Sequence, residues 1–474
     1  MSTPTLSPTR APAALGRWAP LPVVLAGTFM VVLDFFIVNV AAPSMQAGLH
    51  VGSATLEWVV AGYSLTAAVG LLPAGRLADR YGRRRAFALG LGLFTLASAG
   101  CGLAGGPLEL VAARLLQGVG AALVMPSVLS LIAVLYDGVD RARALSAYGA
   151  TMGLAAVSGQ LIGGLLLAAD PLGLGWRAVF LINLPVGAAA LALAPRRVPE
   201  SRAPDAGRTD PAGIVLFTMS LTAVVLPLLE GRTHGWPAWT WASLGAGLAG
   251  LGAFAAWQRA LERRGEGDRA LVAPSRLAVG ALRRGLVAQL VFWCGQASFF
   301  LVLALYLQQG RGLHALAAGL VFTVLALAYV ATSLLAPALT ARHGRGVVAA
   351  GALALAAGHG LLLAVALSHG TGGPWWMLVP GLLVGGAGMG LALPALATLL
   401  VSAARPQDAG TVSGVVSTAQ NVGNAIGVAL VGAVFFGALG GGYGHAFALA
   451  EASLAALLLA VAALSRTLPA GVHS

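Results

Sequence analysis

The sequence contains no lysine and few charged residues of either sign. All 28 basic residues are arginines, and charged residues make up only 9% of the 474 positions. Soluble domains carry about 25% charged residues, so an ordinary soluble protein of this length is excluded. The two cysteines, Cys101 and Cys294, both fall within long apolar runs, so their spacing supports neither a disulfide framework nor a metal site.

Apolar runs dominate the chain. Hydrophobic residues make up 58% of it, and a helix needs about 20 apolar residues to cross about 30 Å of hydrocarbon. Lipid offers backbone groups no hydrogen-bond partners, so each such run is predicted to be a helix. We predict an all-α integral membrane protein with fourteen transmembrane helices. Their approximate ranges are 21–43, 57–77, 86–105, 108–134, 144–168, 177–195, 211–231, 236–257, 285–308, 315–339, 347–368, 375–402, 409–437 and 446–465.

The sequence that follows the second predicted helix recurs after the tenth. The segments PAGRLADRYGRR and PALTARHGRG match at offsets of 262 to 264, although the second lacks the aspartate. The matched pairs are Pro73 and Pro337, Arg80 and Arg342, Gly82 and Gly344, Arg83 and Arg345, and, with offsets up to 268, Pro126 and Pro394, Gly159 and Gly423, and Gly163 and Gly427. The repeat predicts two pseudo-symmetric six-helix bundles with a helix pair inserted between them. The predicted division is a tail at 1–20, a bundle at 21–196, a linker with two extra helices at 197–284, a bundle at 285–466 and a tail at 467–474.

The arginines are distributed unevenly along this predicted topology. With the N-terminus in the cytoplasm, all arginines except Arg114, Arg177, Arg232 and Arg311 fall in inner loops and tails. This split follows the positive-inside rule and predicts that both termini face the cytoplasm of a bacterial plasma membrane. The net charge of +12 is then explained by contact with anionic lipid headgroups, and no nucleic-acid partner is expected. The first apolar run is too long for a signal peptide, so no cleavage is expected.

Several motifs together resemble a known family. They are GRLADRYGRRR at 75–85, LDFFIVNVAAPSM at 33–45, ARLLQGVGAALVMPS at 113–127, WRAVFLINLPVG at 176–187, LYLQQ at 305–309 and NVGNAIGVAL at 421–430. In their order and spacing they resemble the fourteen-helix drug:proton antiporter branch of the major facilitator superfamily. The resemblance implies alternating access around a central cavity, proton-coupled export, and a plan of six, two and six helices. We expect a monomer without cofactor or metal, whose partners are protons, membrane lipids and a small lipophilic substrate.

The charged segment at 75–85 joins the second and third predicted helices. We expect a sharp cytoplasmic turn, permitted by Gly75 and Gly82 and flanked by Arg80. The resemblance implies that Asp79 pairs with an arginine such as Arg83 and faces a helix N-terminus of the other bundle, so that it latches the inner side closed. The alternative is a basic loop that only fixes topology, although that role does not explain the aspartate.

Asp34, Arg114 and Gln117 are predicted to share one level within the membrane. Counted along their helices, they lie about 9–13 Å below the outer face. Arg114 and Gln117 also share a helix face at a spacing of three residues. Burial raises the pKa of a carboxylic acid and a nearby cation lowers it, so this set suits a proton carrier. The alternative is a permanent structural ion pair between Asp34 and Arg114.

Other ionisable residues are expected to have lesser roles. His359 lies in the middle of a predicted helix that corresponds to a peripheral one in the family, so we expect a packed, neutral histidine. Glu230 and Glu451 are within about two turns of helix ends and are expected to reach water or headgroups. Glu57 begins the second helix at the outer surface. None of these is expected to be the main coupling site.

Helix five carries the glycines Gly159 and Gly163, which are spaced for close helix packing. This stretch resembles the antiporter signature of the family, in which a glycine-proline step seals the outward path; here Gln160 replaces the proline. The substrate is expected to meet aromatic and amide side chains in the cavity. The candidates are Gln117, Phe35, Phe36, Tyr63, Asn183, Trp293, Gln296, Phe299, Phe300, Gln420 and Asn424.

An enzyme is not expected. The match GAGLAG at 245–250 to the dinucleotide-binding pattern lies inside an apolar run with no preceding strand, so helix packing explains it better. We therefore predict a secondary active transporter that exports small lipophilic drugs or metabolites by proton antiport. The alternatives are an uptake permease for a metabolite or siderophore, and a lipid flippase or membrane enzyme.

Overall fold

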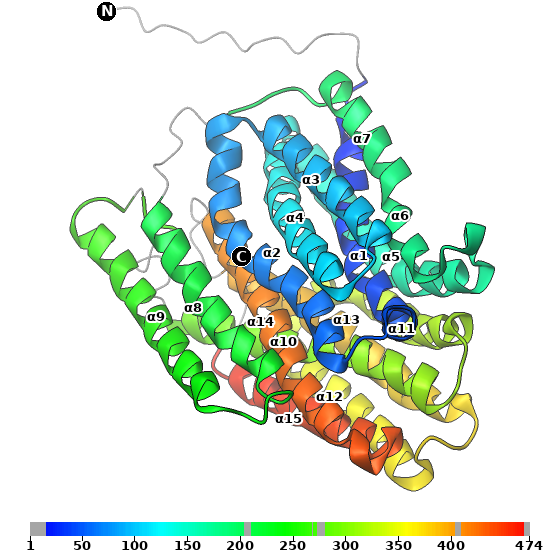
Figure 1. Cartoon of the computed structure of the whole chain (residues 1–474). Coiled ribbons are helices and arrows are strands. Elements are labelled where there is room, and N and C mark those ends of the chain that lie inside the picture. The colour runs from blue at the N-terminus through cyan, green and yellow to red at the C-terminus, as the bar shows by residue number, and fades with distance from the viewer. Residues whose placement is uncertain (1–15, 203–209, 268, 273–279, 403–408, 469–474) are drawn as a thin grey trace, which may run out of the picture.

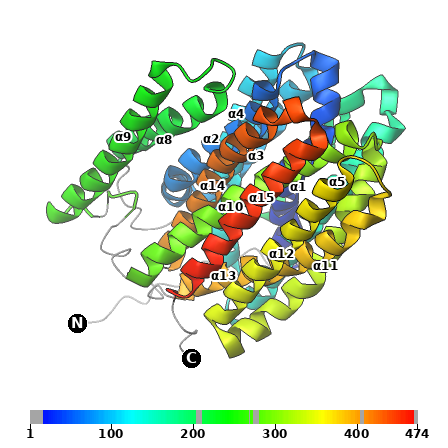
Figure 2. The same ribbon diagram turned by 90° about the horizontal axis from the view of Figure 1, so that it is seen from below.

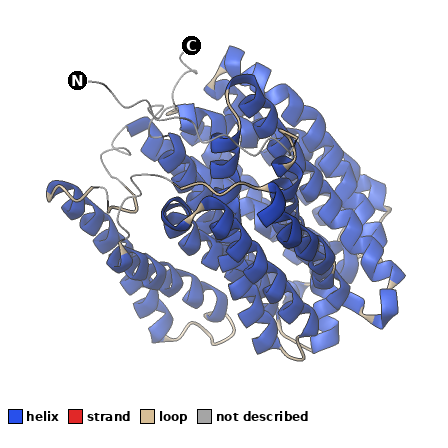
Figure 3. Ribbon diagram, turned by 90° about the horizontal axis from the view of Figure 1, so that it is seen from above, coloured by secondary structure: helices blue, strands red, loops and turns tan. Residues whose placement is uncertain are grey.

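The computed structural model describes residues 16–202, 210–267, 269–272, 280–402 and 409–468, and its regular structure over these residues is entirely helical (Figure 1). Figure 3 shows helices and connecting loops without a strand in the described part of the chain. Within the same residues, thirteen helical segments are long and apolar enough to cross a membrane. The predicted all-α membrane architecture is confirmed, and the protein is a multi-pass membrane protein.

The first set of helices, blue to green in Figure 1, gathers into one bundle. Within it α1 packs against α5, and α4 packs against both α2 and α3. Two short 3-10 turns, η1 (Pro171–Gly173) and η2 (Gly175–Arg177), precede α6. The helices are α1 (Pro20–Leu49), α2 (Ser53–Tyr81), α3 (Arg83–Leu103), α4 (Pro107–Leu135), α5 (Gly138–Ala169), α6 (Ala178–Leu181) and α7 (Asn183–Arg197).

A second set of helices lies beside the first, as the view from below shows (Figure 2). Here α12 packs against α13 and α15, and α10 packs against α14. The helices are α10 (Gly280–Leu305), α11 (Ala315–His343), α12 (Arg345–His369), α13 (Val379–Ser402), α14 (Ala409–Gly437) and α15 (Tyr443–Ser465). The short turns are the π-helical η3 (Tyr306–Gly310) and the 3-10 turns η4 (Trp375–Leu378) and η6 (Leu439–Gly441).

Two further helices flank both sets (Figures 1 and 2). Helix α8 (Pro211–Glu230) packs against α9 (Ala238–Arg263) and also contacts α2 and α14. Helix α9 forms where a span was predicted, but it is not one of the thirteen apolar segments in the described residues. Its tryptophans, Trp239, Trp241 and Trp257, and its glycines lower its mean hydropathy.

One local prediction was wrong. Helix α2 continues to Tyr81, so Gly75 lies inside it and only Gly82, with a φ of +115°, separates α2 from α3. The helix expected at 177–195 is present as one apolar span, Gly175–Arg197, in which Ile182 between α6 and α7 keeps helical angles, with φ −59° and ψ −25°. Pro185 has no N–H to donate to the carbonyl of Leu181, four residues earlier, so one helical hydrogen bond is absent near the boundary of α6 and α7.

The two sets meet at the end of the bundle remote from Pro20 and Ser465, which we call the distal end. Gln308 Nε2 donates to the carbonyl of Val40 at 2.9 Å. Helices α5 and α11 cross closely, because a Cβ on Gly319 would lie 2.7 Å from the carbonyl oxygen of Gln160. Nearer the other end of α5, a Cβ on Gly149 would meet no atom within 4 Å. The helices are therefore closely joined at the distal end.

Candidate functional site

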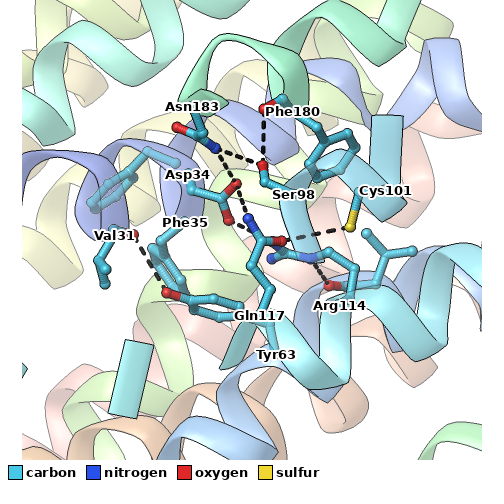
Figure 4. Close-up of polar contacts among 12 residues, drawn as sticks. Val31, Asp34, Phe35, Tyr63, Ser98, Cys101, Arg114, Gln117, Phe180 and Asn183 are labelled. Carbon is cyan, nitrogen blue, oxygen red and sulfur yellow. Dashed lines mark hydrogen bonds and ion pairs between the residues drawn. The ribbon is translucent and has the colours of Figure 1, made fainter. Parts of the chain in front are cut away.

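Asp34 of α1 lies at the centre of a buried hydrogen-bond network (Figure 4). Its Oδ2 accepts a hydrogen bond from Arg114 Nη1 at 2.5 Å, and the two residues form an ion pair. Its Oδ1 accepts from Gln117 Nε2 at 2.7 Å and from Asn183 Nδ2 at 3.0 Å. All four residues are at most 1% exposed. The network joins α1 to α4 and α7 through one carboxylate.

Arg114 has further partners that fix its position. Its Nε donates to the carbonyl of Val59 on α2 at 2.9 Å, and its Nη1 donates to Gln117 Oε1 at 2.8 Å. Its Cζ lies 4.4 Å from the ring centroid of Tyr63, within the range of a cation–π contact. The guanidinium is thus held by a carboxylate, a carbonyl, an amide and a ring. Protonation of Asp34 would remove the one negative charge in this set.

Ser98 of α3 belongs to the same network, although the sequence did not single it out. Its Oγ accepts from Asn183 Nδ2 at 3.0 Å and donates to the carbonyl of Phe180 at 2.8 Å. The available signal was a serine in the small-residue run 97–102, which permits close approach of neighbouring helices. Through Ser98, α3 is linked to the amide that holds Asp34.

Five of the aromatic candidates form a continuous chain of ring contacts. Centroid distances are 6.3 Å from Tyr63 to Phe35, 5.1 Å from Phe35 to Phe36, and 5.0 Å from Phe36 to Phe300. Phe300 then contacts Phe299 at 5.7 Å. The contact between Phe36 and Phe300 joins α1 to α10. This chain brings candidates from both sets of helices together beside Asp34.

The remaining cavity candidates lie on α10 and α14. Trp293, Gln296 and Asn424 are buried, and Gln420 is half-buried. Among the hydrogen bonds of the described residues, none joins these four side chains to the Asp34 network. Their role in binding a substrate stays a prediction.

The charged turn is held by a residue that the sequence did not single out. Asp79 accepts two hydrogen bonds from Arg83, at 3.0 Å from Nε and 2.7 Å from Nη2, so the predicted pairing is present. Glu200 lies against Gly82, and a Cβ there would come within 2.6 Å of its Oε1. Glu200 also accepts from the backbone N–H of Arg84 at 3.1 Å. Arg80 is exposed. The expected contact of Asp79 with a helix N-terminus of the other bundle stays a prediction.

The helix-five glycines pack α5 against α1. A Cβ on Gly159 would lie 2.9 Å from Phe36 Cβ, and one on Gly163 would lie 2.8 Å from Ile37 Cγ1. Gln160 is buried, and neither its Nε2 nor its Oε1 has a hydrogen-bond partner in the described structure. Its side chain therefore sits in a closely packed place without polar compensation.

One expectation for the remaining carboxylates was wrong. Glu451 does not reach water: it is fully buried, and its Oε2 lies 2.6 Å from Nδ1 of the buried His359. Helix α15 packs against α12 at this position, so the side chain cannot reach the protein surface. Glu57 is also buried, at 1% exposure, and forms an ion pair with Arg232 at 3.5 Å. Glu230 accepts from Trp58 Nε1 at 2.7 Å.

Comparisons with known proteins agree with the fold and the motifs. The chain matches the sequence profile described as Major Facilitator Superfamily over residues 24–282, 204–428 and 285–473. A Streptomyces coelicolor protein named "Probable actinorhodin transporter" is 40% identical, over 90% of this chain and 73% of its own length. The "Cephamycin export protein CmcT" of Amycolatopsis lactamdurans is 35% identical, over 95% and 93%.

Solved structures with low sequence identity share the fold. A D-xylose-proton symporter aligns with a TM-score of 0.67 at 17% identity, covering 96% of this chain and 98% of its own. The peptide-transporter-family protein PepTSo aligns with a TM-score of 0.69 at 16% identity, covering 94% and 97%. The profile match and the relatives together show that the chain belongs to the Major Facilitator Superfamily of membrane transporters and is not an enzyme.

Proposed function

We propose that the protein is a secondary active transporter that exports small lipophilic compounds across a bacterial plasma membrane in exchange for protons. The observation that carries this proposal is the buried Asp34 network, with its single carboxylate and single cation. Intramembrane ionisable residues are costly and mark functional sites by default. The names of relatives, which include an export protein and the "Methylenomycin A resistance protein" of Streptomyces coelicolor, support the outward direction.

The proton would act through the contacts that Asp34 makes. Without a proton, Asp34 ties α1 to Arg114 on α4 and Asn183 on α7. A proton on the carboxylate removes the charge that Arg114 balances and weakens these bonds, because charge-assisted hydrogen bonds are about twice as strong as neutral ones. Loading and release of a proton would thereby change how firmly α1 is held.

The movement would occur between two six-helix bundles. We assign residues 21–196 and 285–466 to these bundles and residues 197–284 to the linker that carries α8 and α9, with α9 as the fourteenth span and both termini in the cytoplasm. The distal end, where the bundles are joined, would then face outward. Gln117 and the aromatic chain from Tyr63 to Phe299 lie beside Asp34 and would meet the substrate.

A permanent structural ion pair is the competing explanation for Asp34 and Arg114. Burying two charges costs several kcal/mol per ion, and well-packed apolar residues of similar volume are often at least as stable.

An uptake permease and a lipid flippase remain the competing functions, and the direction and energy source of transport distinguish them.

Accumulation assays in intact cells test the proposal. Cells that express the protein, and cells that express an Asp34→Asn variant as control, are loaded with actinorhodin, methylenomycin A, cephamycin or puromycin, with and without a protonophore. The names of relatives supply this panel. We expect at least one compound to accumulate less in cells with the wild-type protein, and the protonophore to abolish this difference. Accumulation that rises on expression and falls with the protonophore would indicate uptake and contradict export.

A further inference from the structure

His359 and Glu451 form a second buried pair of ionisable residues, far along the sequence from Asp34. His359 of α12 is 3% exposed and Glu451 of α15 is 0% exposed. Nδ1 of the histidine lies 2.6 Å from Oε2 of the glutamate. The other carboxylate oxygen, Oε1, has no hydrogen-bond partner among the described residues. The carboxylate therefore depends on one imidazole.

The helices packed around this pair supply little charge. Helices α13 and α14 contain no residue that titrates or carries charge. Helix α10 carries Cys294 in its middle and two arginines, Arg283 and Arg284, at its start. Helix α11 carries Tyr329, Arg342 and His343, the last two in its final turn. The imidazole ring and the ring of Phe299 form a T-shaped contact, with centroids 4.8 Å apart and planes at 89°.

The two helices that carry the pair have other titratable or charged residues only near their ends. Helix α12 begins with Arg345 and ends with His369, and α15 carries Tyr443 and His445 in its first turn. None of the hydrogen bonds or ion pairs of the described residues joins these groups to His359 or Glu451. Burying such an ionisable pair costs free energy, because the charged forms lose their hydration. Apolar residues of similar volume would pack these helices without that cost.

The internal repeat gives the pair a counterpart in the first bundle. His359 lies one residue from the position that matches Ser98, at an offset of 261 against the 262 of Arg83 and Arg345, and Glu451 matches Asn183 at 268, the offset of Pro126 and Pro394. Ser98 and Asn183 are hydrogen-bonded to each other at 3.0 Å, on α3 and α7, as His359 and Glu451 are on α12 and α15. The same contact thus occurs in both bundles, with ionisable residues in the second.

The buried carboxyl group stands on non-equivalent helices in the two bundles. Asp34 matches Ser298 at an offset of 264, so α10 has a hydroxyl where α1 has its acid. In the first bundle the acid on α1 is bound by the amide of Asn183; in the second the acid stands on α15, at the position of that amide. Each bundle therefore places one buried carboxyl group at the junction of its equivalent helices.

A chain of rings connects the two carboxyl groups. From His359 it passes through Phe299, Phe300 and Phe36, at centroid distances of 4.8, 5.7 and 5.0 Å. Phe36 lies two residues after Asp34 on α1. The pair is therefore packed against the same aromatic contact that joins α1 to α10.

We propose that His359 and Glu451 form a second proton-binding site, in the C-terminal bundle, that loads and releases one proton. This inference rests on the proposed proton-coupled function. With a neutral imidazole and an ionised carboxylate the pair carries one negative charge; uptake of one proton on Oε2, which then donates its hydrogen bond to Nδ1, makes the pair neutral overall. The proton comes from water and returns to it, and no other bond is made or broken.

Infrared difference spectroscopy tests this site without a transported substrate. The full-length protein, reconstituted in lipid, is recorded between acidic and alkaline buffer, and the C=O stretching band of protonated carboxyl groups is followed. Among the bands of the chain's 16 acidic residues, we expect one that is lost in Glu451→Gln and retained in Asp34→Asn, and another with the opposite behaviour. In His359→Gln the Glu451 component should remain and its pH midpoint should shift, because the one hydrogen-bond partner of the carboxyl group among the described residues is replaced.

Each outcome bears on the proposal separately from the function of Asp34. A pH-dependent carboxyl signal that is identical in wild type and a folded Glu451→Gln variant would overturn it. If Glu451→Gln does not fold, an unshifted carboxyl signal in His359→Gln would overturn it equally. Uphill transport by Asp34→Asn would contradict the role of Asp34. If the Glu451 component is retained in that variant, the second site is still supported.

Discussion

Phe36 of α1 and Phe300 of α10 meet edge to face, with ring centroids 5.0 Å apart and ring planes at 81°. Phe36 follows Asp34 by two residues, and Phe300 adjoins Phe299, which contacts His359. One aromatic contact therefore separates the surroundings of the two buried carboxyl groups. Any movement of α1 that follows a change at Asp34 must either carry α10 with it or break this contact.

Replacing either ring should reduce the contribution of the other ring to the free energy of unfolding. In a double-mutant cycle with Phe36→Leu and Phe300→Leu, we expect a coupling energy of about 0.5–1.5 kcal/mol, as for other aromatic pairs. Thermal unfolding of the four purified proteins in detergent measures it. The pair Phe217 and Phe254, on α8 and α9 at 5.1 Å, is the matched control. Phe217→Leu should leave transport unchanged, whereas Phe36→Leu should reduce it; equal effects would contradict a special role of the α1–α10 contact.

Asp79→Asn should reduce transport while expression and membrane insertion stay normal. The amide loses the charge that Arg83 pairs with, and we expect about a fivefold lower rate, equivalent to about 1 kcal/mol. Asp137 and Arg141 provide a matched control, since they are another Asp–Arg pair four residues apart, at 3.2 Å and exposed. Asp137→Asn should transport normally. If both variants behave alike, the charged turn serves topology only.

The ion pair of Glu57 and Arg232 predicts an asymmetry between two substitutions. Arg232→Ala leaves a buried carboxylate without its cation, for which the cost in unfolding free energy is about 3–5 kcal/mol. Glu57→Gln removes the charge and should cost less, and the double variant should be more stable than Arg232→Ala alone. Melting temperatures in detergent provide the comparison. An Arg232→Ala protein as stable as Glu57→Gln would show that the carboxylate is not held by Arg232.

Gly319→Ala should disturb the distal end. The added methyl group would lie 2.7 Å from the backbone oxygen of Gln160, and neither backbone can yield easily. We expect a loss of about 1–3 kcal/mol in unfolding free energy from overpacking. Gly360→Ala in α12 is the control, because a Cβ there would meet no atom within 4 Å. Equal melting temperatures for the two variants would rule out a close α5–α11 crossing.

The sequence predicted the helices and the level of the main site, but not the rotation of each helix. Counting residues from the helix ends placed Asp34, Arg114 and Gln117 together, because rise per residue is nearly constant. Asn183 was assigned to the substrate instead of to Asp34, since its direction depends on the rotation of α7 about its own axis. Distance from a helix end was a poor guide for Glu451, because packing against α12, and not depth, decides whether that side chain reaches water.

Partners remote in sequence were also beyond prediction. Glu200 holds the turn at Gly82 from 118 positions away, and nothing near either residue indicates the contact. Ser98 lacked any signal beyond its small size. In both cases the link depends on the tertiary packing of helices, which a single sequence specifies only in part.

Uphill transport by Asp34→Asn tests the central claim most directly. Membrane vesicles that contain wild-type or variant protein are given an imposed pH gradient and membrane potential, which supply about 2.3 kcal/mol per charge per 100 mV. The compound is one from the panel that the wild-type protein exports. Asparagine keeps nearly the volume of aspartate but cannot gain or lose a proton. We predict that the variant exchanges the compound across the membrane without concentrating it, whereas concentration of the compound against its gradient by Asp34→Asn vesicles would contradict the assignment of Asp34 as the coupling site.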